Sequence, residues 1–114
     1  VEAAISNLDA AQLDTPYRPG GWTVAQVVHH LADSHINCYA RVKLTLTENK
    51  PVIRPYDENA WVQQADAQQL PVNNATTLLH ALHQRLYLLL KSVEDADWQR
   101  PYIHPDSGEH TLWN

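Results

Sequence analysis

The sequence of 114 residues lacks the features on which several protein classes depend. It holds one cysteine, Cys38, so a scaffold built on internal disulfides is excluded. No apolar run approaches the roughly 18 residues that a membrane-spanning helix needs. The eight Lys and Arg residues are outnumbered by 13 Asp and Glu residues, which gives a net charge of −5 with histidine neutral. Neither nucleic acid nor an anionic membrane is therefore an expected partner.

Methionine is absent as well, and the chain begins at Val1 within a helical pattern of apolar residues. We therefore expect a chain that has been trimmed at its N-terminus. No charged segment followed by an apolar one is present to act as a secretory signal, which favours a cytoplasmic location. The composition, with 44% hydrophobic and 18% charged residues, is that of a soluble globular protein. At roughly 100–200 residues per domain, residues 1–114 amount to a single domain.

A long helix is predicted over residues 23–47. Thr23 and Gln26 form a capping-box pattern, in which each side chain satisfies a free backbone amide at the start of a helix. Residues of an apolar stripe then recur every three or four positions, and no proline interrupts them until Pro51. The stripe consists of Val24, Val27, Val28, Leu31, His35, Cys38, Val42 and Leu46.

A second long helix is predicted later in the chain. Prolines indicate a loop at residues 50–56, and an acidic start followed by helix-compatible residues predicts a short helix over residues 57–67. Asn73 or Asn74 can then cap a helix with a broad leucine-rich stripe that reaches Val93.

The two ends of the chain are less regular. Residues 1–8 have the spacing of a helix end, and residues 9–21 form an expected connection. Residues 101–108 are rich in turn formers, after which Leu112 and Trp113 open another element. Strands have little support, so the predicted fold class is an all-α bundle with long connections.

Seven histidines are the compositional feature that suggests chemistry, because neutral imidazole is the commonest metal ligand. At about 100° per residue, His30 lies at the edge of the apolar stripe, whereas His29 points away from most of it. His30 is therefore the better candidate for a site inside the bundle. The alternative for His30 is a half-buried imidazole that bonds to a carbonyl or carboxylate. His35 lies within the stripe. It is either a structural residue of the core or a residue that lies beside the site.

The remaining candidates are weaker. His80 and His83 have a spacing that can place two imidazoles on one metal ion, but the helical wheel turns His80 outward and favours a solvated pair. His104 and His110 bracket a turn that either holds polar side chains toward a cleft or forms a surface loop. Cys38 lies in the apolar stripe with no base beside it, which favours burial over nucleophilic use.

Residues 17–35, with the sequence YRPGGWTVAQVVHHLADSH, closely resemble the YfiT branch of the DinB-like superfamily. The resemblance continues through RVKL at residues 41–44, PYDE at residues 55–58, Trp61, Leu82 with His83, and HPDSGEH at residues 104–110. It covers nearly the whole chain. It implies a four-helix bundle with a divalent metal ion, nickel or zinc, held by three histidines.

The resemblance also assigns residues to the metal site. In the family, one metal ligand is the histidine just before the last residue of the stretch W-[ST]-x-x-x-[VIL]-x-x-H-[LIV], which corresponds to His30 here. By the same resemblance, the polar groups implied to surround the site are His35, Asp33, Arg41, His104 and His110. The other two ligands of the family form an H-x-x-x-H pair on a later helix, and this spacing does not occur in the sequence. We therefore expect a partial bundle whose final ligand helix is missing, and a chain that is metal-free by itself.

The resemblance implies two enzymatic functions. One is a metal-dependent hydrolase of a small-molecule substrate, and the other is a metal-dependent thiol S-transferase that joins a thiol such as bacillithiol to an electrophile. A metal ion with an open coordination position can activate water or hold a thiolate. The non-enzymatic alternative is a metal-free helical module for binding or dimerisation. Members of the superfamily are often homodimers, and we expect the same here.

Overall fold

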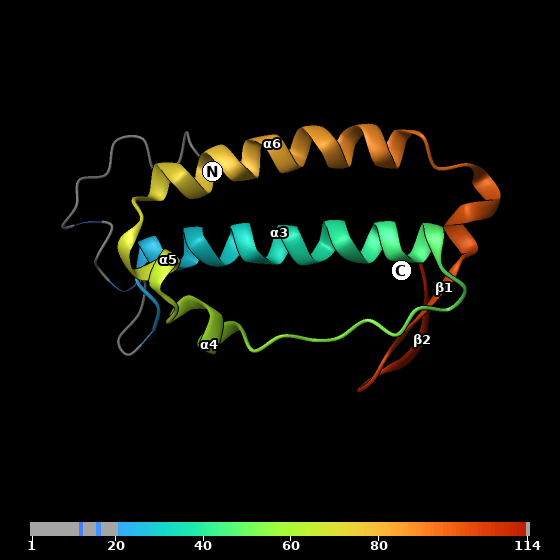
Figure 1. The fold of residues 1–114 in the computed structure, drawn as a ribbon, viewed down its shortest axis with the longest axis horizontal. Coiled ribbons are helices and arrows are strands. Elements are labelled where there is room, and N and C mark those ends of the chain that lie inside the picture. Colours follow the sequence, from blue (N-terminus) through green and yellow to red (C-terminus); the bar gives the residue numbers. More distant parts are fainter. Residues whose placement is uncertain (1–11, 13–15, 17–20, 114) are drawn as a thin grey trace. The chain divides into compact units, whose positions relative to one another are not determined.

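The computed structural model describes residues 12, 16 and 21–113, and this part of the chain is mainly helical (Figure 1). The all-α class predicted from the sequence is confirmed. The predictions for residues 1–8 and for most of residues 9–21 lie outside the described residues. In chain order the elements are α3 (Val24–Thr47), α4 (Glu58–Val62), α5 (Ala65–Gln69), α6 (Val72–Lys91), the 3-10 helix η1 (Asp95–Gln99), β1 (Pro101–His104) and β2 (Gly108–Thr111).

Helix α3 begins where the capping box predicts. The backbone N–H of Thr23 donates to Oε1 of Gln26 over 2.8 Å, and the N–H of Gln26 donates to Oγ1 of Thr23 over 3.1 Å. These two bonds satisfy amides that have no partner within the helix. The prediction of a helix over residues 23–47 is therefore confirmed to within one residue.

The single short helix predicted over residues 57–67 is in fact two helices, α4 and α5. Asp57 caps α4, since its Oδ1 accepts a hydrogen bond of 3.1 Å from the N–H of Ala60. The helix ends at Val62, whose carbonyl accepts a 3.2 Å hydrogen bond from the side-chain amide of Gln68 in α5. Because a side chain satisfies this carbonyl, the helix can stop without a proline or glycine.

Helix α6 begins at Val72, directly after Pro71, so the prediction that Asn73 or Asn74 caps it is wrong. Proline is favourable at a helix start because its missing N–H is one that the helix would leave unpaired. Asn73 lies in the first turn instead, and its carbonyl accepts the hydroxyl of Thr77 over 2.7 Å.

Residues 101–111 form an antiparallel β-hairpin, where the sequence predicted a turn without strands. Gly108 follows the turn with a φ of 87°, a left-handed conformation that suits glycine. Ile103 of β1 also pairs with the loop before α4: its N–H donates to Pro51 over 2.9 Å, and its carbonyl accepts from Ile53 over 2.7 Å. This pairing joins distant segments, so a local sequence pattern could not reveal it.

Leu112 and Trp113, which the sequence analysis expects to open another element, lie in a turn. Their backbone N–H groups donate to the carbonyls of Arg100 and Trp98, both over 2.9 Å. The indole rings of Trp98 and Trp113 also meet edge to face at 5.7 Å. These contacts fasten the end of the hairpin to η1.

The chain divides into two compact units. Unit 1 contains Val1–His35 and Asp57–Ala81, and unit 2 contains Ile36–Tyr56 and Leu82–Asn114. Helices α3 and α6 each begin in unit 1 and end in unit 2. The assignment of residues 1–114 to one domain stays a prediction.

The core of unit 1 joins the first halves of α3 and α6. Val28 and Ala32 of α3 pack with Ala75 and Leu79 of α6, and all four are at most 4% exposed. Removing the side chain of Leu79 from water contributes about 2 kcal/mol to folding. Val62 of α4 is fully buried as well.

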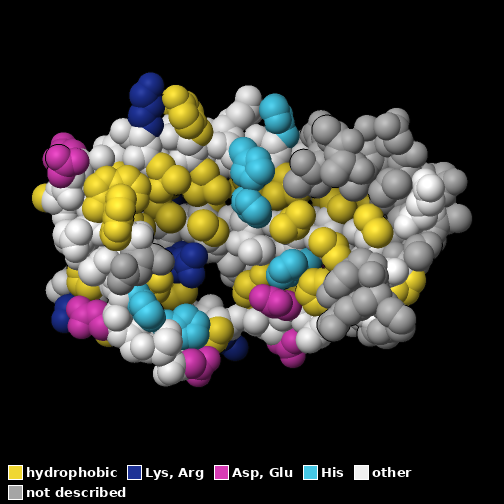
Figure 2. All heavy atoms as spheres, turned by 180° about the vertical axis from the view of Figure 1, so that it is seen from behind, with side chains coloured by type: hydrophobic (Ala, Val, Ile, Leu, Met, Phe, Trp, Pro, Cys, Tyr) yellow, Lys and Arg dark blue, Asp and Glu magenta, His cyan; other side chains and the backbone are white. Residues whose placement is uncertain are grey.

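Several large apolar side chains remain at the surface, as Figure 2 shows for one face of the molecule. On α6, Tyr87 and Leu88 are 63% and 67% exposed. None of the helices among the described residues combines the length and the apolarity that a membrane span requires.

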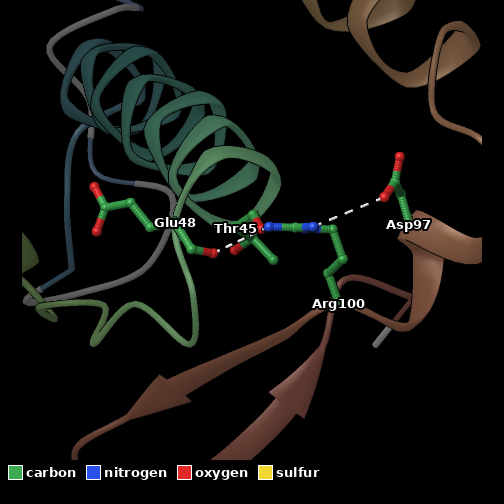
Figure 3. Close-up of polar contacts among 4 residues, drawn as sticks. All are labelled: Thr45, Glu48, Asp97 and Arg100. Carbon is green, nitrogen blue, oxygen red and sulfur yellow. Dashed lines mark hydrogen bonds and ion pairs between the residues drawn. The ribbon is translucent and has the colours of Figure 1, made fainter.

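Arg100 closes the end of α3 in unit 2 (Figure 3). Its Nε donates to the carbonyl of Thr45 over 2.8 Å, and its Nη2 donates to the carbonyl of Glu48 over 3.2 Å. Asp97 of η1 holds the other side of the guanidinium at 3.9 Å. The last carbonyls of a helix lack partners within it, so a cation at this position stabilises the helix end.

Candidate functional site

Helix α3 presents three histidines in unit 1, and two of them are held by backbone carbonyls. His29 is buried, and its Nε2 lies 3.1 Å from the carbonyl oxygen of Leu70. His35 is half-buried, with Nδ1 2.8 Å from the carbonyl oxygen of Leu31. Because a carbonyl oxygen only accepts hydrogen bonds, each of these nitrogens carries a hydrogen and is not available to a metal ion.

His30 differs from its two neighbours. It is half-buried, and its ring lies 4.9 Å from the ring of Trp22 at an angle of 60°. Trp22 is itself held by a 3.0 Å hydrogen bond from Nε1 to Oδ1 of Asn59 in α4. Within the described part of the chain, no hydrogen bond engages the ring nitrogens of His30. This imidazole is therefore positioned by packing, and its two nitrogens are available to bind a ligand.

The burial of His29 could not be predicted from helix α3 alone. The helical wheel turned it away from most of the apolar stripe, yet it is 7% exposed. The wheel considers α3 alone, whereas the segment between α5 and α6 supplies the carbonyl of Leu70 that receives this imidazole. Burial of a polar ring beside a suitable acceptor costs little, because the hydrogen bond replaces the one to water.

Asp33 lies one turn beyond His29 and His30 on α3. Burial raises the pKa of its carboxyl group above the ordinary value of 3.8, and the negative charge of Asp66 adds to this effect. His29 and His30 act in the opposite direction. Asp33 is thus close enough to both histidines for their charge to lower the pKa of its carboxyl group.

The other residues predicted to surround the site belong to unit 2. Arg41 of α3 lies over the ring of Tyr102, with 5.7 Å from Cζ to the ring centre. Tyr102 stacks on His110 at 5.5 Å. His104 accepts a 3.2 Å hydrogen bond at Nδ1 from the backbone N–H of Asp106. The structure thus brings His30, His35 and Asp33 together on one stretch of α3, and Arg41 together with His110.

The described residues do not complete a metal site by themselves. Among them, no group of three or more His, Cys, Asp and Glu side chains is arranged to hold a metal ion. His30 can serve as one metal ligand, since no hydrogen bond from the described residues engages its nitrogens. A stable metal site needs several ligands. His80 and His83 of α6 are both exposed, as expected for solvated side chains.

Sequence reasoning missed the neighbours that orient these groups. Asn59, which holds Trp22, and Tyr102, which joins Arg41 to His110, come from segments distant in the sequence. The alternation of apolar and polar residues in a four-residue strand is too short to distinguish from a turn. No local signal could have identified these partners.

Comparison with known proteins adds a family and a fold. A family model described as the DinB superfamily matches residues 1–114. A protein of Bacillus mycoides is 52% identical over 109 residues, which are 96% of this chain and 62% of the relative. A protein of Bacillus cereus has the same identity and coverage. The names of both relatives propose a metal-dependent hydrolase. The chain thus spans 62% of the length of these relatives.

Among solved structures, YfiT from Bacillus subtilis superposes with a TM-score of 0.92 and is 49% identical in sequence. The match covers 97% of this chain and 64% of YfiT. YfiT is described as a probable metal-dependent hydrolase with an unusual four-helix bundle topology. The prediction of a four-helix bundle is confirmed by this likeness.

Proposed function

Because this chain belongs to the DinB superfamily, we propose that the protein is a metal-dependent hydrolase of a small-molecule substrate, with His30 as one metal ligand. The names of the curated relatives and of YfiT support the reaction class. The observation that carries the assignment of His30 is that no hydrogen bond from the described residues engages its imidazole, so either ring nitrogen can bind a metal ion, whereas His29 and His35 each have one nitrogen bonded to a carbonyl. The remaining ligands would come from outside the described residues.

Nickel or zinc is the proposed metal. A divalent ion with three protein ligands keeps a coordination position for water and lowers the pKa of that water toward neutrality. The residues of this chain would hold and orient the first ligand. Trp22 packs against the ring of His30, and Asn59 fixes Trp22 by its hydrogen bond. Asp33 would add a carboxylate near the same ring.

This proposal is tested by measuring the hydrolytic activity of the protein expressed from its complete reading frame. We expect hydrolysis of a panel of simple esters and amides, loss of that activity after chelation, and recovery with nickel or zinc. His30→Ala should abolish the activity, while His80→Ala, which changes an exposed histidine on α6, should retain it.

The same panel separates the alternatives. A metal-bound protein that is inert toward esters and amides but transfers a thiol to an electrophile would replace the hydrolase with a thiol S-transferase. A metal-free protein that is inert in both assays would overturn the enzymatic proposal in favour of a helical binding module. Tyr87 and Leu88 are exposed on α6, and such apolar side chains support the further proposal of a homodimer, which molar mass in solution would test.

A further inference from the structure

Two cations of unit 2 converge on the phenol of Tyr39. Lys43 lies one turn after Tyr39 on α3, and its Nζ is 4.9 Å from the centre of the tyrosine ring. Arg85 reaches the same phenol from α6. Both side chains act as hydrogen-bond donors to the phenol group. Two helices of the same unit therefore place positive charge beside one oxygen atom.

These contacts weaken the hold of the oxygen on its proton. The hydrogen bond from Lys43 lowers the pKa of the Tyr39 phenol below its ordinary value of 10.0. Desolvation of the ring opposes this effect but is outweighed, because the hydrogen bond from Arg85 and the charges of both cations also lower the pKa. A neighbouring positive charge favours the charged form of an acid. Tyr39 thus becomes a phenolate more readily than an ordinary tyrosine does.

The helices around Tyr39 supply cations but no carboxylates. Neither residues 36–47 of α3 nor residues 82–91 of α6, which belong to unit 2, include Asp or Glu. The cations of these two stretches are Arg41, Lys43, Arg85 and Lys91. A carboxylate on either stretch would compete with the phenol for Lys43 and Arg85. The sequence of the two helices therefore favours negative charge on the oxygen of Tyr39.

Tyr39 can also be reached by a small reagent, since its side chain is only half-buried. Tyr102 is 8% exposed, and the phenol oxygen of Tyr56 is buried. Tyr87 of α6 is 63% exposed, and the cation beside it, Lys91, lies over the ring with Nζ 5.7 Å from the ring centre. Among the tyrosines that the structure describes, Tyr39 thus combines access with two cations at its phenol group.

We propose that Tyr39 is a nucleophilic phenol and a site of O-acylation by small activated acyl compounds. The phenol oxygen forms a bond to the acyl carbon, and the bond from that carbon to the leaving group breaks. The leaving group takes the electron pair of the broken bond, and the phenol proton passes to a base in solution. Lys43 and Arg85 promote the step because they keep more of the oxygen in its deprotonated, nucleophilic form. The step uses no residue of the proposed metal centre.

The acetylation rate of Tyr39 in the protein from its complete reading frame tests this site. The reagent is N-acetylimidazole, which is small and acetylates phenols, and mass spectrometry of proteolytic peptides measures the acetyl group at each tyrosine. Hydroxylamine removes acetyl groups from phenols but not from lysine, so it separates modification of Tyr39 from that of Lys43. We expect Tyr39 to react about threefold faster, or more, than both Tyr87 and N-acetyltyrosine amide in the same solution. Because the amide is fully exposed, greater exposure could not explain such a result.

Three variants test the part played by the cations. Lys43→Gln and Arg85→Gln each replace an exposed side chain, so the fold should be retained, and each should slow the acetylation of Tyr39 toward the rate of the amide. Lys91→Gln removes another exposed cation of the same unit and should leave the rate at Tyr39 unchanged.

Two controls assign the signal to this phenol. Tyr39→Phe should abolish the hydroxylamine-sensitive acetyl group in the peptide that contains residue 39. A wild-type rate at Tyr39 in His30→Ala would separate the reaction from the proposed metal centre. A Tyr39 that reacts no faster than N-acetyltyrosine amide would overturn the proposal, as would wild-type rates in both Lys43→Gln and Arg85→Gln.

Discussion

Nε of Arg100 donates a hydrogen bond of 2.8 Å to the backbone carbonyl of Thr45 (Figure 3). A residue just before the hairpin thus caps helix α3, which ends at Thr47. Arg100→Ala removes this bond and the one to Glu48. We expect a loss of about 1–3 kcal/mol in the free energy of unfolding, measured by urea denaturation, because helix carbonyls lose a charged donor. Arg54→Ala, at an exposed position, is the matched control. Equal stabilities of the two variants would contradict this account of the cap.

The neighbouring histidines of α3 should respond differently to removal. His29→Ala leaves the carbonyl of Leu70 without its donor and should cost about 1–3 kcal/mol of unfolding free energy. His30→Ala loses packing against Trp22 but no hydrogen bond among the described residues, so its cost should be smaller. Urea denaturation of the metal-free protein measures both. A larger loss for His30→Ala would make His30 a structural residue instead.

Asp33 predicts a dependence of stability on pH. Its pKa is raised in the folded state by burial and by Asp66, so the folded chain keeps a proton that the unfolded chain has already lost. Stability from this group therefore falls as the pH rises from about 3.8 through the folded pKa. The side chain introduced by Asp33→Asn does not titrate, so this variant should not lose stability through this group as the pH rises.

The measurement for Asp33 is the unfolding free energy of both proteins across the acidic range. The advantage of Asp33→Asn over the wild type should grow with rising pH and then become constant above the folded pKa. An advantage that shrinks as the pH rises would mean that the pKa of Asp33 is lowered by folding.

The core of unit 1 predicts a contrast between two leucines of α6. Leu79 is 2% exposed and packs with Val28 and Ala75, so Leu79→Ala should cost about 2–5 kcal/mol of unfolding free energy. Leu88 is 67% exposed, and Leu88→Ala should change stability by less than about 0.5 kcal/mol in the isolated chain. Thermal or urea unfolding distinguishes the two, and similar losses would show that Leu88 is covered in solution.

Helix α3 could be predicted from the sequence because its signals are local. The capping pair of Thr23 and Gln26 marks its start, and the apolar spacing extends to Thr47. The hairpin could not be predicted, since Ile103 is held by Pro51 and Ile53, about fifty residues away.

The candidate site shows the same limit. The periodicity of α3 placed His30 at the edge of the buried stripe, where the structure finds it half-buried. It could not predict the burial of His29, because the acceptor at Leu70 lies 41 residues away in the sequence. Tyr102, which links Arg41 to His110, was missed for the same reason.

The central claim is that His30 is a metal ligand, and the most direct measurement is the metal content of the protein expressed from its complete reading frame. Elemental analysis should find about one nickel or zinc ion per chain in the wild type and in His80→Ala, and almost none in His30→Ala. A wild-type protein without metal, or a His30→Ala variant with the full complement, would contradict the claim.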